Sequence, residues 1–149
     1  MSSSPTSGCA RRFEATIAAL ARPADLRSLP LVAVHLVLGL RLCGVCEAVG
    51  RDAAVELTRR LHSVTAAVAV VELAAEVARV WPEPFATGRP CMTALSHDER
   101  TLAELVRAGL AADRERFSRA IDGLVRNDRH ERLYAAVVGA AAALPLRPA

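Results

Sequence analysis

Residues 31–49 constrain this chain more than any other stretch, because they are apolar on nearly every side of the helix that they would form. A helix of this kind is either surrounded by other helices or placed in a membrane. Crossing a bilayer takes roughly 20 apolar residues, and here His35 interrupts the run and Arg41 closes it. The segment therefore predicts a central, buried helix and no membrane span.

The rest of the composition also favours helices. Apolar residues make up 52% of the 149 residues but aromatic residues only 3%, and isoleucine occurs only as Ile17 and Ile121. Alanine and leucine favour helices, whereas sheets are rich in β-branched and aromatic residues. We expect an all-α fold, a single-domain bundle of five or six helices over residues 7–146, preceded by a flexible tail at residues 1–6.

Apolar spacing, prolines and capping residues set the limits of the expected helices. They fall at about residues 9–21, 31–49, 53–80, 97–108, 113–126 and from Asn127 or Asp128 to Pro145. Ser96 and Glu99 form a capping box, which marks a helix N-terminus. In the third helix, the side chains expected to face inward are Leu57, Leu61, Val64, Val68, Val71 and Ala75.

Two cysteines, Cys43 and Cys46, lie three residues apart within the apolar segment. At this spacing both thiols share one face of a helix, where they pack as small hydrophobic residues, act as a redox pair or bind a metal. The spacing is similar to that of the helical alkylhydroperoxidase-like proteins, in which a histidine follows the second cysteine by four residues. This chain has Gly50 there.

A metal site on this pair needs further ligands. Cys91 and His97 are the obvious ones, and two or three thiolates with an imidazole suit tetrahedral zinc. The sequence thus yields one candidate zinc site, formed by Cys43, Cys46, Cys91 and His97. We expect, however, that the cysteines are core residues and that no cofactor is bound, and zinc is the alternative.

The loop before the capped helix carries a second candidate site. It holds the only tryptophan, and Trp81, Phe85 and Arg89 would form a binding edge unless the loop is a structural clasp. Its motifs resemble a family of small uncharacterised helical proteins from GC-rich, alphaproteobacterial genomes. The resemblance, which implies no activity, rests on Trp81-Pro82-Glu83-Pro84, Arg89-Pro90-Cys91 and Leu95-Ser96-His97-Asp98-Glu99.

The charged residues exclude several classes of function. The chain has 19 basic residues, all arginine, so no lysine is present to form a Schiff base or to bind phosphate in a P-loop. The arginines alternate with 16 acidic residues instead of forming a basic patch, which argues against nucleic-acid binding. Without a catalytic constellation or a secretory signal, we expect a cytoplasmic, bacterial, non-enzymatic module. It would bind another protein or itself, as a homodimer, and the alternative is a thiol-redox or metal-binding protein.

Overall fold

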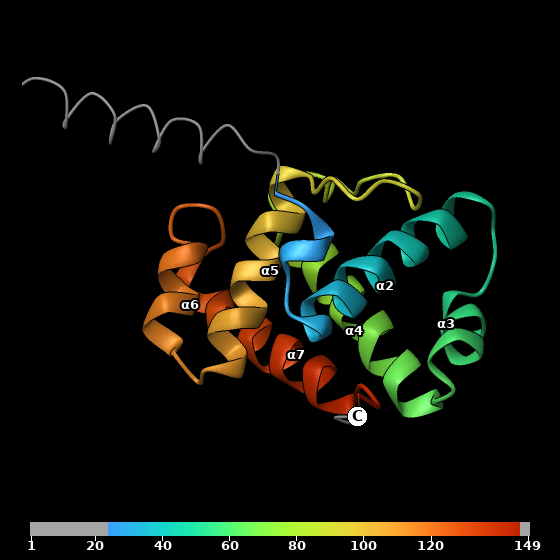
Figure 1. Ribbon diagram of the computed structural model, residues 1–149. Helices are drawn as coiled ribbons and strands as arrows, with labels where there is room; N and C mark the ends of the chain where they lie inside the picture. Colours follow the sequence, from blue (N-terminus) through green and yellow to red (C-terminus); the bar gives the residue numbers. More distant parts are fainter. Residues whose placement is uncertain (1–23, 147–149) are drawn as a thin grey trace, which may run out of the picture.

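Six α-helices and two short 3-10 turns make up the regular structure of residues 24–146, the part of the chain that the computed structural model describes (Figure 1). The tail expected at residues 1–6 and the helix expected at residues 9–21 lie outside this part. The elements are η1 (Leu26–Ser28), α2 (Leu31–Ala48), α3 (Ala53–Leu61), α4 (Val64–Val80), α5 (His97–Leu110), α6 (Arg114–Ala120), η2 (Asn127–Arg129) and α7 (His130–Ala143).

The helices pack around one core, and the predicted all-α bundle is confirmed. Helix α4 packs against α7, α3 and α2, and α5 packs against α2, α6 and α7. Helices α3 and α6 therefore lie at opposite ends of the molecule (Figure 1). Leucine, valine and alanine side chains fill the core, with Phe117 and Ile121 at the α6 end. Within residues 24–146 the only β-type contact is an isolated bridge between Asp25 and Ala94.

The prediction of a single helix over residues 53–80 is wrong, because a helix break at His62 and Ser63 separates α3 from α4. His62 ends α3 in the left-handed conformation, with φ 52°, and the Ser63 hydroxyl caps α4 by accepting a hydrogen bond from the Ala66 amide (3.1 Å). This break changes the phase of the helix, so Val64 and Val68 face solvent instead of the core. The buried residues of α4 are Ala66, Ala67, Val70, Leu73, Glu76, Val77 and Val80.

The helix predicted over residues 113–126 also ends early. Helix α6 stops at Ala120, and a turn follows in which the Leu124 amide donates to the Ile121 carbonyl (3.0 Å). Gly123 lies in this turn with φ 74°, a conformation that glycine adopts without strain. The glycine therefore stops a helix whose apolar pattern continues.

The capping box predicted at the start of the fourth helix is confirmed. The Ser96 hydroxyl accepts from the Glu99 amide (3.0 Å), and the Glu99 carboxylate accepts from the Ser96 amide (2.9 Å). Glu99 is also fully buried, although capping glutamates usually lie in solvent. It therefore has a second role, which involves an arginine of α2.

Arg41 of α2 connects that helix to α5 and to the loop between α4 and α5. Its guanidinium donates two hydrogen bonds to the Glu99 carboxylate, at 2.7 and 2.8 Å. It donates three more to the carbonyls of Arg89 (3.0 Å), Met92 (2.6 Å) and Ala94 (2.9 Å). A guanidinium has five N–H donors, so every donor of this buried arginine has an acceptor.

The Glu99 carboxylate also has hydrogen-bond partners for both of its oxygens. Its two oxygens accept from Arg41, from the Gly88 amide (2.9 Å) and from the Ser96 amide. Burial alone would raise the pKa of the Glu99 carboxyl, but these hydrogen bonds outweigh burial and hold the pKa below its usual value. The carboxylate is therefore ionised at neutral pH and pairs with Arg41 as a buried salt bridge.

We expect Arg41→Met to lower the free energy of unfolding by about 3–5 kcal/mol, because it leaves the Glu99 charge buried without its partner. Urea denaturation followed by circular dichroism measures the change. The matched control is Arg51→Met, since Arg51 is exposed and has no side-chain hydrogen bond or ion pair within residues 24–146. The control should change stability by less than about 0.5 kcal/mol. Equal effects of the two substitutions would contradict a structural role for the pair.

Gly88 tests the geometry of the same network. A Cβ at this position would lie 2.5 Å from Nη2 of Arg41 and 3.3 Å from the Ala94 carbonyl oxygen, and the hydrogen bonds of Arg41 prevent it from moving away. Gly88→Ala should destabilise the protein by about 1–3 kcal/mol. Gly139→Ala is the control, because no atom lies within 4 Å of its added Cβ in α7. It should stabilise the protein by about 0.5–1 kcal/mol. Thermal unfolding of both variants distinguishes the two effects.

Candidate functional site

The four candidate zinc ligands lie on two helices and a loop. Cys43 is half-buried and Cys46 is buried in α2, Cys91 is exposed in the loop, and His97 is the exposed first residue of α5. Among the residues that the structure describes, no group of three or more His, Cys, Asp or Glu side chains is positioned to hold a metal ion. A zinc site therefore remains a prediction that this geometry does not support.

The Cys43 thiol lies in an environment that keeps it protonated. Burial, the neighbouring Cys46 and the charge of Glu47 together raise the pKa of Cys43 to about 11. Because the thiolate is the nucleophile in disulfide exchange and alkylation, a thiol with this pKa reacts slowly at neutral pH. Redox-active cysteines usually have the opposite shift, so this environment suits a packed cysteine better than a catalytic one.

We expect iodoacetamide to modify Cys91 well before Cys43 at pH 7.5, because Cys91 is exposed whereas Cys43 is half-buried and protonated. The Cys43 rate should rise about tenfold per pH unit until the pH approaches 11. Peptide mapping after timed alkylation follows each cysteine separately. A Cys91→Ser variant shows whether modification at Cys91 alters the Cys43 rate. Rapid alkylation of Cys43 at pH 7.5 would contradict the protonated state.

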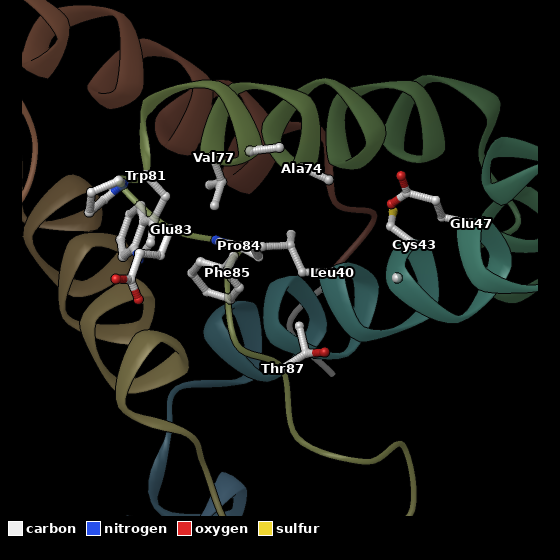
Figure 2. Close-up of a pocket in the computed structure, with 13 residues that line it drawn as sticks. Leu40, Cys43, Glu47, Ala74, Val77, Trp81, Glu83, Pro84, Phe85 and Thr87 are labelled. Atoms are coloured by element: carbon white, nitrogen blue, oxygen red, sulfur yellow. The ribbon is translucent and has the colours of Figure 1, made fainter.

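The three residues predicted to form a binding edge, Trp81, Phe85 and Arg89, do not line one site. Trp81 and Phe85 line a cavity of about 530 Å³ between α2, α4 and the loop, where Figure 2 shows them beside Leu40 and Val77 with Cys43 farther along. Their rings meet edge to face, with centroids 5.1 Å apart. Arg89 does not line this cavity.

The loop is fastened to the bundle at several points. The Ala86 amide donates to Asp98 (2.7 Å), and the Ser96 hydroxyl donates to the Ala86 carbonyl (2.5 Å). Together with the Arg41 hydrogen bonds, these contacts tie the loop to both α2 and α5. These contacts hold the loop against the bundle, as expected of a structural clasp, while its residues 82–84, 86, 87 and 89–93 are exposed.

The sequence pattern did not predict that one face of α2 would leave a row of apolar side chains exposed. We call it the α2 row: five apolar residues, Leu31, Leu38, Leu42, Val45 and Val49, together with His35. Its members are spaced alternately by four and three residues, so they lie along one face of the helix. Leu31 is 60% exposed, Leu38 40%, Val45 41% and Val49 62%. The prediction that other helices surround this segment is therefore wrong on this face.

The opposite face of α2 is packed against the bundle. Its buried residues are Ala33, Leu36, Val37, Gly39, Leu40, Arg41 and Cys46. By length and composition alone, α2 is the one helix of the described residues that is apolar enough to cross a membrane, but 39% of it is buried within the fold. Packing of this face and the paired Arg41 make α2 a structural helix of the bundle with one apolar side uncovered.

The α2 row forms the floor of a groove of about 740 Å³. Four of its side chains line the groove, from His35 to Val45. One wall is the C-terminal part of α3, and the other side is bordered by Pro90 of the loop. The lining residues from α3 are Leu57, Arg59, Arg60 and Leu61, followed by the C-cap residue His62. The result is an apolar floor bordered by basic side chains.

The charged residues that line this groove are all basic. None of the described residues that line it is an aspartate or glutamate. Arg59 contacts Glu56 at 3.3 Å but is 72% exposed, and Arg60 has no ion-pair partner within residues 24–146. The exposed Arg89 precedes Pro90 on the other side. The groove therefore offers positive charge beside an apolar surface.

Comparison with known proteins gives no match to a family model, to a curated protein or to a solved structure. The resemblance to an uncharacterised alphaproteobacterial family therefore stays a prediction.

Proposed function

We propose that this protein is a non-enzymatic binding module that holds an apolar helical segment of a partner protein in the groove between α2 and α3. The observation that carries the proposal is the α2 row, in which four large apolar side chains are 40–62% exposed along one helix face. Grooves that receive amphipathic helices contact their ligands at the same spacing of three and four residues.

The dimensions of the row suit a helix. From His35 to Val45 the groove floor spans about 15 Å at 1.5 Å per residue, which matches about three turns of a partner helix, and Leu31 and Val49 extend the row beyond the groove at its two ends. The wall formed by α3 makes the surface concave, so it fits a rod better than a flat surface. A contiguous apolar surface of this kind is a typical mark of an interaction site.

The polar groups near the groove support binding more than catalysis. His35 hydrogen-bonds through Nδ1 to the carbonyl of Leu31 (2.8 Å), and no carboxylate lines the groove to pair with His35 or His62. General acid–base chemistry usually needs such a pair of oriented groups. Nearby Cys43 is held protonated and lines the other cavity.

We expect Val45→Glu and Leu38→Glu each to weaken binding of a neutral probe peptide by at least about tenfold, because a carboxylate would have to be buried against apolar side chains. The probe is a helical peptide of 18 residues, the length of α2. It carries leucines at alternating spacings of three and four, with glutamine and alanine elsewhere. Isothermal titration calorimetry with the full chain measures its affinity.

The matched control is Val68→Glu, because Val68 of α4 is 43% exposed, close to the 41% of Val45, and does not line the groove. It should leave the affinity unchanged. Sedimentation equilibrium of the same proteins tests self-association, the other form of protein binding. A wild-type chain that neither binds the probe nor self-associates would contradict the proposal, as would equal weakening by all three substitutions.

A further inference from the structure

We infer that the partner of this groove is an acidic amphipathic helix of another protein and not a second copy of this chain. The inference rests on the proposed binding function and adds the chemistry of the partner. It is carried by the charges at the rim, where Arg59 and Arg60 border the apolar floor and no described carboxylate lines the groove.

The arginines are positioned to reach a bound helix. Arg59 and Arg60 belong to the last turn of α3, which forms one wall of the groove. Across the groove, the exposed Arg89 stands next to the lining residue Pro90. A helix on the α2 row would therefore lie beside the guanidinium groups of the α3 wall, and guanidinium groups bind carboxylates with two parallel hydrogen bonds.

Positive charge remains at the rim after the internal ion pairs are formed. Arg59 pairs with Glu56, but its side chain is 72% exposed, so water screens the pair and weakens it. Arg60 has no ion-pair partner among the described residues, and the Arg89 side chain makes no ion pair there either. By contrast, Arg41, whose side chain also borders the groove, is fully engaged with Glu99 and loop carbonyls. The free positive charge is thus confined to the rim.

The same charges argue against two other occupants. A second copy would bring its own Arg59 and Arg60 to the shared seam, where like charges oppose association. The N-terminal residues 1–23 of this chain, which lie outside the described part, contain Arg11, Arg12 and Arg22 but only one acidic residue, Glu14. A second copy of the chain and the segment 1–23 are both positively charged, so neither complements the charge of the groove.

The deciding experiment compares three peptides of 18 residues that share one leucine face and differ only in their flanking residues, which are glutamate, glutamine or lysine. At low salt we expect the glutamate peptide to bind the full chain about 3- to 30-fold more tightly than the glutamine peptide. The lysine peptide should bind most weakly. The differences should shrink at 0.5 M salt, because added ions screen exposed charges.

The variant Arg59→Gln/Arg60→Gln should abolish the preference for glutamate, so that the glutamate and glutamine peptides bind this variant with equal affinity. The control is Arg119→Gln/Arg126→Gln, which removes two charges at the opposite end of the molecule. Arg119 matches Arg59 closely, since it is 71% exposed and pairs with a glutamate of its own helix. This control should keep the full preference.

The outcomes separate the inference from the function on which it rests. Equal binding of the three peptides, or preference for lysine, overturns the acidic partner but keeps a helix-binding groove. A dimer in sedimentation that Val45→Glu dissociates overturns it as well, because a second copy then occupies the groove. Binding to anionic lipid vesicles through the α2 row, without binding of any peptide, overturns both proposals.

Discussion

The hydrogen-bonded pair of Arg41 and Glu99 is the interaction on which the arrangement of this molecule depends. Burying two charges costs several kcal/mol unless every donor and acceptor is satisfied. Here the guanidinium uses all five of its donors, and the carboxylate accepts from Arg41 and from two backbone amides. Because its partners lie on α2, α5 and the intervening loop, the pair fixes how these three segments meet.

That orientation determines what α2 presents to solvent. Arg41 must face α5 and the loop. The face of α2 that carries it is therefore turned into the core, and the buried residues of the helix run from Ala33 to Cys46. The α2 row is then left on the outer face, although its side chains are as apolar as those inside. The exposed row is therefore a consequence of the buried ion pair as well as of the apolar sequence.

The sequence predicted what depends on local signals and missed what depends on distant ones. The all-α fold, the start of α5 and its capping box follow from composition and from neighbouring residues. The ion pair joins residues 58 positions apart, and Glu99 already had a local explanation as the capping residue. Likewise, the break at His62 was hidden because the apolar pattern continues on both sides of it. Of the inward positions predicted beyond the break, Val64, Val68 and Ala75 are exposed, and Val71 is partly buried.

The candidate site was the hardest feature to predict, for a physical reason. Periodicity identifies the buried face of a helix only when the other face is polar, and α2 is apolar on both. Such a pattern has two solutions: helices cover every side, or one side is kept for a partner. The choice depends on how many helices reach α2, and α3, α4, α5 and α7 together leave the α2 row open. The arginines at the end of α3 place positive charge beside that open face. Their position depends on how α3 packs against α2, and the sequence of either helix alone does not predict it.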